Sequence, residues 1–400
     1  NLHPGKANMY SFAQVIISGS RIARNRSRKQ WASIVFIFGL VTGILCAPSG
    51  VLTAQSLCYG AGCNVLPLSQ TDLNSMLLST KVQYADPLAR DMSEATAVAN
   101  IPTVPLGSIT MNGFSVGAGA DATYKPEEDV TVYIPNVGTI SDLKAVGFGV
   151  NGRFQGGLNL GQILDAGRDN DPFSASRFEV WLSGLEKKHE ETELDTYNTL
   201  QGKYALPPTY RASVYSRALD VRYHIFEEKG SVWLGWSGLS VLTGVHSMRQ
   251  DLYYRRIDSK ARINLVDNVN LLWDGIDIAE MRSRFDTYPL ELQTGFRLLY
   301  VLGINLGGGM AWHKGSTNFQ LTRTGLVYPE SDLLSIIGIN DLSTGLLLRM
   351  PGDGSAPARM AFFRAGLTLH LWAFKIDVEG MQSGNTKTVA GNIRFEMDLD

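Results

Sequence analysis

The sequence predicts an all-β protein, namely a transmembrane antiparallel up-and-down β-barrel of about 12 strands with a short N-terminal helical segment. Three observations predict this fold. Apolar and polar residues alternate along many segments, several of these segments run to ten residues or more, and aromatic residues gather near segment ends. Alternation separates the two faces of a strand, and a tilted strand crosses a bilayer in about 9–11 residues. A soluble secreted β-sandwich is the main structural alternative.

The composition agrees with this fold class without deciding it. The chain has 400 residues, with 36 Lys and Arg against 38 Asp and Glu, so its net charge is −2. This balance gives no support to a nucleic-acid partner. Charged residues make up 18% of the chain, below the roughly 25% usual in soluble domains, and glycines number 41. Such a composition fits a wall that faces lipid, but it also fits many secreted β-proteins.

Residues 1–54 are interpreted as an N-terminal extension and a signal peptide. Residues 21–29 carry five positive charges, an apolar run extends from Trp31 to Leu45, and Ala54 is a small residue at a plausible cleavage point. This order is that of a secretory signal, and the apolar run is shorter than the roughly 20 residues of a membrane span. An uncleaved membrane anchor is the alternative. Because the chain begins with Asn, Met9 is a candidate for the true start.

The cysteines lie near the predicted cleavage point. Cys58 and Cys63 enclose a short flexible loop, and export would bring them to an oxidising compartment, so we expect a disulfide. A metal site has little support with two cysteines and no nearby His. Lipidation at Cys46 is a minor alternative, because the large Leu45 precedes that cysteine and matches a lipobox poorly.

Residues 55–104 are predicted to form a periplasmic or plug-like helical segment that includes the Cys58/Cys63 loop. Leu73, Leu77 and neighbouring apolar residues follow helical spacing, and Pro87 interrupts the pattern. We expect one or two short helices that pack at the barrel mouth, fill it or cover its periplasmic end.

Residues 105–400 are predicted to form the barrel. The clearest alternation lies at 290–302, with Leu290 and Leu292 on one face and Glu291 and Gln293 on the other. The segments 219–225 and 392–399 alternate in the same way, and weaker examples include 146–155, 178–184 and 360–371. Apolar side chains are expected to face lipid and polar ones the lumen.

The polar residues of these segments are therefore candidates for the lumen. Both signs of charge are interspersed among them, which slightly favours a filled interior with paired acids and bases over an open polar passage. The lumen-facing candidates are Asp220, Arg222, His224, Glu291, Gln293, Arg297, Lys375, Asp377, Glu379, Arg394, Glu396 and Asp398.

Loops and aromatic residues complete the membrane pattern. The long charged stretch 186–208 is expected to be an extracellular loop. Aromatic residues near strand ends are expected to form girdles at the two membrane interfaces. They are Tyr210, Phe226, Trp233, Trp236, Tyr253, Tyr254, Trp273, Tyr288, Trp312, Phe362, Phe363, Trp372 and Phe374.

Motifs of enzymes occur here without their structural context. Residues 147–152 match the dinucleotide-binding glycine spacing, but alternation continues through them, so the glycines are interpreted as serving close packing or strand curvature. Residues 113–117 match a nucleophile elbow around Ser115 with no helix after it. His246 and Ser247 allow the idea of a lipid hydrolase. No paired His spacing supports a metal centre, and no cofactor or catalytic residue is predicted.

The layout resembles outer-membrane barrels of Gram-negative bacteria and spirochaetes, and the Cys58/Cys63 loop followed by helix and barrel is similar to leptospiral surface-adhesin proteins. The resemblance implies exposure at the cell surface and binding of host matrix proteins or plasminogen. One departure is the chain end, Met397-Asp398-Leu399-Asp400, where many outer-membrane proteins have an aromatic residue.

Three functions follow, all in the outer membrane with lipid as a partner. The first is a porin-like channel or transporter of small or apolar solutes. The second is an adhesin or receptor barrel that binds a host or other protein partner through its loops. The third is a lipid hydrolase, although we expect no enzyme.

Overall fold

The structure is a computed structural model, and the chain divides into two units, Asn1–Leu52 and Thr53–Asp400. Only the second unit contains described residues. Predictions for the signal peptide, for Met9 and for Cys46 lie outside them. The structure describes residues 54–60, 63, 69–106, 113–134, 138–161, 174–192, 209–231, 233–264, 270–299, 301–329 and 344–398.

Ten antiparallel strands close into a ring within the described residues. The last ring strand, β13, pairs with the first, β2, and so seals the seam. In ring order the strands are β2 (Gly113–Ile134), β3 (Gly138–Asn159), β4 (Phe178–Thr192), β5 (Thr209–Phe226), β7 (Leu234–Asn264), β8 (Asn270–Leu298), β9 (Leu302–Pro329), β11 (Arg359–Leu371), β12 (Phe374–Ser383) and β13 (Thr386–Asp398).

The prediction of an antiparallel all-β barrel is confirmed. A closed ring leaves no strand edge in lipid, where unpaired backbone groups find no water. Three further strands pair beside the ring strands rather than within the ring, and helical segments precede the barrel. They are β1 (Gln55–Tyr59), β6 (Lys229–Gly230) and β10 (Thr344–Gly354).

An apolar belt surrounds the ring. Along β11, buried and exposed residues alternate, so that Phe363 and Leu367 point outward while Arg364 is buried. Tyr288 and Trp312, which pair across β8 and β9, lie at one edge of the belt, and the exposed Trp372 lies at the turn beyond the other. These aromatics fit the expected girdles. Trp273 and Phe362 do not, because both are buried in apolar clusters.

The segment 290–302 is not one strand. β8 ends at Leu298, Leu299 adopts a positive φ of 55°, and β9 begins at Leu302. A tight hairpin turn therefore divides the clearest alternating segment. The turn contains Leu299 and Val301 instead of the Gly or Asn that marks such turns, so residue types alone do not reveal it.

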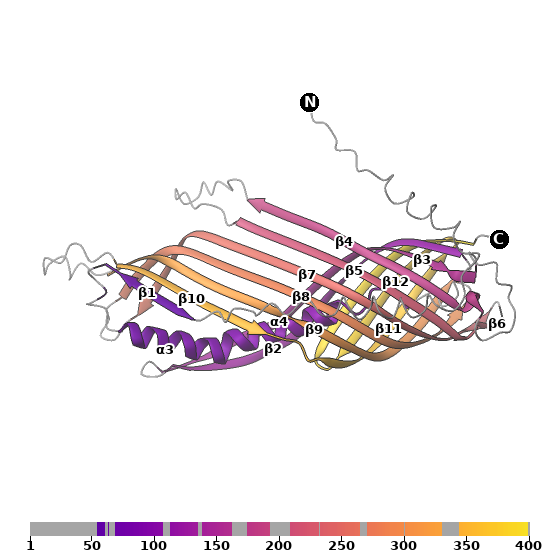
Figure 1. Cartoon of the computed structure of the whole chain (residues 1–400), viewed down its shortest axis with the longest axis horizontal. Helices are drawn as coiled ribbons and strands as arrows, with labels where there is room; N and C mark the ends of the chain where they lie inside the picture. Colours follow the sequence, from indigo (N-terminus) through magenta and orange to yellow (C-terminus); the bar gives the residue numbers. More distant parts are fainter. Residues whose placement is uncertain are drawn as a thin grey trace, which may run out of the picture. The chain divides into compact units, whose positions relative to one another are not determined.

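Several strands continue far beyond the belt and form what we call the extension. β7, β8 and β9 have 31, 29 and 28 residues, whereas β11, β12 and β13 have 13, 10 and 13. Figure 1 shows β7, β8 and β9 running well past β11 and β12. On β8, the outward side chains next to Tyr288 are Asp286, Arg284, Arg282 and Glu280, followed by Ile278 and Ile276 on the same face. This part of the sheet therefore has a face suited to water.

Helices cover the sheet edges that the short strands leave open. α3 (Gln70–Thr80), η2 (Lys81–Ala85) and α4 (Asp86–Ala99) form one continuous helical path that contacts both β2 and β10. Gln83 exchanges two hydrogen bonds with the backbone of Tyr133 in β2, and the backbone N–H of Asp353 in β10 donates to Asp86 at 3.0 Å. Helical side chains thus take the place of a neighbouring strand at both edges.

Pro87 does not break the helical path, contrary to the predicted interruption. It lies in the first turn of α4, where its missing N–H costs little, and the preceding turn widens into the π-helical η2.

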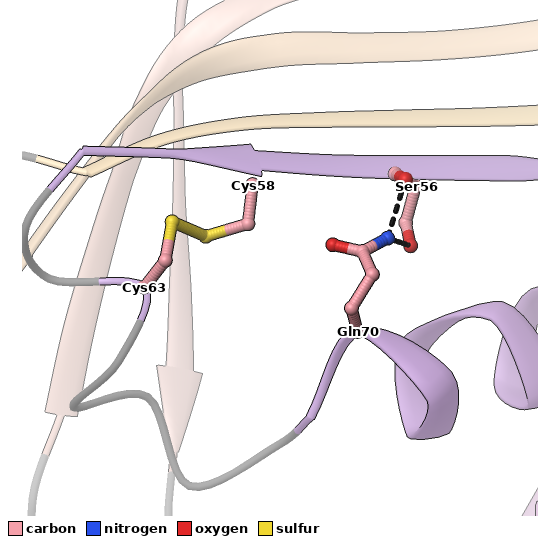
Figure 2. Close-up of a disulfide and its surroundings, with 4 residues drawn as sticks. All are labelled: Ser56, Cys58, Cys63 and Gln70. Carbon is pink, nitrogen blue, oxygen red and sulfur yellow. Dashed lines mark hydrogen bonds between the residues drawn. A yellow bond between two sulfur atoms is a disulfide. The ribbon is translucent and has the colours of Figure 1, made fainter.

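The disulfide between Cys58 and Cys63 is present, as predicted. It closes the chain just after β1, and Figure 2 shows Gln70, the first residue of α3, donating hydrogen bonds back to Ser56. Ser69 and Asp72 form a capping box at the start of α3. Together these contacts attach the beginning of the helical path to strand β1, which itself pairs with β10.

The predicted boundaries at residues 54 and 104 stay predictions. Within the described residues, no helix is long and apolar enough to cross a membrane.

The apolar belt generates a stability prediction. Leu292 points outward near the middle of the belt on β8 and is 52% exposed in the absence of lipid. Leu292→Arg is expected to lower the free energy of unfolding by about 2–4 kcal/mol, because it places a charge in hydrocarbon. Urea unfolding in lipid vesicles, followed by tryptophan fluorescence, measures this change.

The matched control is Asn318→Arg, which adds the same side chain to an exposed outward position of the extension. We expect that variant to lie within about 0.5 kcal/mol of the parent. An equal loss in the free energy of unfolding for both variants would contradict the assigned position of the belt.

Candidate functional site

The interior of the ring holds helix α4 and the segment that follows it, residues 100–106, which we together call the plug. Every residue from 101 to 106 is buried, as are most residues of α4. α4 is rich in Ala, and it packs against glycines of the wall. A Cβ at Gly149 would come within 2.7 Å of the Ala95 carbonyl oxygen. Gly147 and Gly149 thus serve close packing of a helix against a strand, whereas Gly152 faces Leu185 of β4.

Arg364 forms the central clamp between the wall and the plug. Its guanidinium, which is fully buried, donates to Glu291 at 2.9 Å and contacts Glu379. The same group donates to the backbone carbonyl of Val104 at 2.9 Å, and the N–H of Leu106 donates to Glu379 at 2.7 Å. Strands β8, β11 and β12 are thereby tied to the plug through one cation.

Arg222 repeats this arrangement on the other side of the interior. It donates to Glu179 at 3.0 Å and to the backbone carbonyl of Pro105 at 2.8 Å. Glu179 also accepts from Trp181 at 3.1 Å and contacts His224 at 2.8 Å. A carboxylate with this many donors is well compensated for its burial.

His246 belongs to a third cluster, to which the plug contributes Asn100 and Thr103. Its Nδ1 lies 2.7 Å from the Asn100 carbonyl oxygen and its Nε2 lies 2.6 Å from Asp220. Thr103 donates to Asp220 at 2.8 Å. Both ring nitrogens therefore lie within hydrogen-bonding distance of oxygen atoms, one from the plug and one from the wall.

Salt bridges at other levels complete the interior. Lys125 of β2 binds Asp91 at 2.7 Å and Glu94 at 2.9 Å, both on α4. Arg153 binds Asp121 at 2.7 Å across β2 and β3. Plug and wall are therefore connected by ion pairs as well as by apolar contacts, such as those of Val98 and Ile101 with Phe362.

The structure buries most of the predicted lumen-facing residues. Asp220, Arg222 and His224 meet the plug or its partners, and so do Glu291 and Glu379. Gln293 is buried, Asp377 pairs with Arg394 at 3.3 Å, Lys375 pairs with Glu396, Arg297 pairs with Glu228, and the side chain of Asp398 lies outside the described ones.

Sequence reasoning missed several members of this network. Arg364, Arg153 and Glu179 lie in segments whose alternation was recognised but weak, so the same rule could have found them. The contribution of the plug had no sequence signal, because its contacts to Arg222 and Arg364 come from backbone carbonyls.

The described residues contain no assembled site for the lipid hydrolysis considered from the sequence. Ser115 is buried with an unpartnered hydroxyl, and Ser247 forms no hydrogen bond with a histidine there. The described residues also contain no group of three or more His, Cys, Asp or Glu placed to hold a metal ion.

The outer face of the extension has an open hollow of about 520 Å³. It lies over β4, β5, β7 and β8, and its lining mixes both charges with one aromatic ring. Arg211 lies 5.7 Å from the ring centroid of Tyr253, a cation–π distance. The lining includes Lys188, Arg211, Asp251, Tyr253, Glu280, Arg282 and Arg284.

A family model described as Lsa36-like matches residues 51–397. The chain belongs to the Lsa36-like family. This confirms the predicted resemblance to leptospiral surface adhesins, and with the closed, belted ring it identifies an outer-membrane β-barrel. No curated protein matches the sequence of this Lsa36-like chain.

Solved outer-membrane structures resemble the Lsa36-like chain loosely. Omp33 of Acinetobacter baumannii is 8% identical, with 72% of this chain and 99% of that one covered and a TM-score of 0.23. A Pseudomonas aeruginosa FadL homologue is 8% identical, with coverage of 79% and 98% and a TM-score of 0.26. The translocator domain of the Neisseria meningitidis autotransporter NalP is 8% identical, with coverage of 72% and 89% and a TM-score of 0.29. We draw no functional argument from these.

The Arg364 clamp generates the next prediction. Arg364→Met is expected to lower the free energy of unfolding by about 3–5 kcal/mol, because it leaves two carboxylates and a carbonyl buried without their donor. Urea unfolding in vesicles measures the loss.

The control for this variant is Arg282→Met, which removes an exposed arginine that lies 3.5 Å from Glu280. Exposed pairs contribute about 0–1 kcal/mol, so little change is expected. A similar small change for Arg364→Met would show that the clamp does not hold the plug.

Proposed function

We propose that this protein is a surface-displayed receptor barrel of the adhesin type, whose lumen is closed and whose extension binds a protein partner. The single observation that carries the proposal is the occupation of the ring by the plug, which is tied to the wall at Arg364, Arg222 and His246. A barrel filled in this way serves better as an anchor than as an open passage.

The extension supports the same proposal. Its strands are far longer than a bilayer requires, and the part of β8 before Tyr288, residues 270–287, corresponds to roughly 60 Å of strand beyond the belt. A wall of that length displays a water-exposed face well away from the membrane. The hollow on this face offers arginine and tyrosine side chains, the residue types enriched in the energetic centres of protein interfaces.

We infer that the extension lies outside the cell, and the lengths of several loops support this orientation. The two long connections 193–208 and 330–343 join strands at its far end. At the opposite end, two or three residues connect β8 to β9 and β11 to β12, while residues 160–177 form one longer connection between β3 and β4. Bacterial barrels have short periplasmic turns and longer extracellular loops. The predicted loop 186–208 is shorter than expected, since β4 continues to Thr192.

A channel or transporter of small or apolar solutes is the second candidate. One observation favours it: α4 rests on glycines, namely Gly147 and Gly149 of β3 and Gly354 of β10. A helix on such a smooth surface has few interlocking side chains to hinder displacement. A permanently closed barrel and a gated barrel are expected to differ in conductance when the contact between α4 and these glycines is disturbed.

Conductance distinguishes these candidates. The intact protein is expected to give no stable current steps in planar bilayers. Gly149→Val should displace α4 and produce open events, because a side chain there meets the helix backbone. Gly391→Val is the matched control, since a side chain at that position meets nothing within 4 Å. Steady conductance of the intact protein would favour the channel instead.

Partner binding is tested at the loop beside the hollow. β4 and β5, which both line the hollow, are joined by residues 193–208. Replacing 194–207 with a Gly-Ser linker of equal length is expected to weaken binding to immobilised matrix proteins or plasminogen at least tenfold, about 1.4 kcal/mol.

The same replacement at 331–342 is the control, because that loop joins β9 and β10, which do not line the hollow. Both variants should remain heat-modifiable on gels. Unchanged binding after the first replacement, in a folded barrel, would contradict the proposed site.

A further inference from the structure

An unusual group of cations lies on the outer wall directly beyond the aromatic edge of the belt. Register places Tyr215, Arg249, Arg284 and Ser316 side by side on β5, β7, β8 and β9. The row between them and the belt contains Arg217, Ser247, Asp286 and Lys314. We call Arg217, Arg249, Arg284 and Lys314 the headgroup cluster; all four are exposed.

The cluster lacks enough acidic partners. None of its four cations has an ion pair among the described residues, where Asp286 is the only acid in these two rows apart from Glu186, which faces Lys188 at 3.6 Å. Arg249 and Arg284 stand directly opposite each other on neighbouring strands. Like charges in such a pair are destabilising, so this arrangement favours an anion between them.

Tyr215 holds two of the guanidinium groups in place. Arg217 lies 4.6 Å and Arg249 5.7 Å from its ring centroid. Stacking on a tyrosine limits the positions of a guanidinium while leaving its N–H groups available. Arranged guanidinium groups bind phosphate by paired, charge-assisted hydrogen bonds.

The height of the cluster identifies the source of the phosphate. Tyr288 and Trp312 mark the edge of the hydrocarbon, and Arg284 and Ser316 lie four residues further along the same strands. Arg217 and Lys314 lie only two residues beyond that edge, or about 7 Å of strand. The polar headgroup layer is itself some 5–7 Å thick on each side of the bilayer.

We propose that the headgroup cluster binds phosphate-bearing lipid headgroups of the leaflet that surrounds the base of the extension. The site differs from the proposed partner surface in its ligand, and of its four cations only Arg284 also lines the hollow. It depends on the belt rather than on any protein partner. It fixes the depth of the barrel in the membrane, since the belt binds hydrocarbon and the cluster binds the phosphates immediately above it.

The experiment compares lipid retention by the full chain in native mass spectrometry after reconstitution with phosphorylated or dephosphorylated lipid A. The parent is expected to retain the phosphorylated form at least tenfold better. Arg217→Gln with Arg249→Gln should lose that preference. Arg217→Lys with Arg249→Lys should keep part of it, because charge remains while the paired hydrogen bonds are lost.

The matched control is Arg211→Gln with Arg282→Gln, which removes the same charge from the same face farther from the belt. It is expected to retain lipid like the parent. Equal retention of both lipids by the parent, or an equal loss in the control, would overturn the proposal. Full competition by inorganic phosphate would also overturn it, since a lipid site should resist the free anion.

Folding of each variant is checked by heat-modifiability on gels. The retention of the two forms of lipid A by the parent tests the proposal even where a variant fails to fold. No protein partner is present in these measurements, so their failure is independent of any failure in the binding of matrix proteins.

Discussion

Buried arginines determine what can fill this barrel. A guanidinium has five N–H donors and keeps its charge at any physiological pH, so each one enclosed by the ring needs several acceptors. The wall supplies carboxylates, Glu291 and Glu379 for Arg364 and Glu179 for Arg222. The remaining acceptors are the carbonyls of Val104 and Pro105, two consecutive plug residues. The course of the plug follows from the placement of these two cations.

The wall has two parts, the closed ring around the belt and the extension beyond it. Around the belt, all ten strands pair and the outer face is apolar, which satisfies the backbone in lipid. Beyond the belt, β11, β12 and β13 have ended, and the remaining strands would have open edges in water. α3, η2 and α4 cover those edges through Gln83, Asp86 and Ser93, whose side chains bind backbone groups of β2 and β10. One helical path thus serves both the extension and the interior.

Much of this fold could be predicted from alternation alone, and the reasons for the rest are specific. Alternation placed Asp220 and Arg222 opposite Leu219 and Val221, as the buried and exposed faces of β5 show. It failed at Leu299, because an apolar turn between two strands looks like one longer strand. Alternation also did not predict the length of the extension, since the outward charges on β8 resemble the lumen-facing residues of a separate strand. Contacts made by carbonyl oxygens, such as that of Val104, leave no trace in side-chain identity.

The order of elements along the chain has a consequence for biogenesis. Helix α4 precedes every ring strand in the sequence, and the seam forms between β2 and β13, the first and last strands of the ring. The helix that fills the barrel is therefore translated before the strands that enclose it. When the final hairpin is added, closure of the seam and enclosure of the helix are one event, and an assembly factor that handles this chain must accept a nascent barrel that is already occupied.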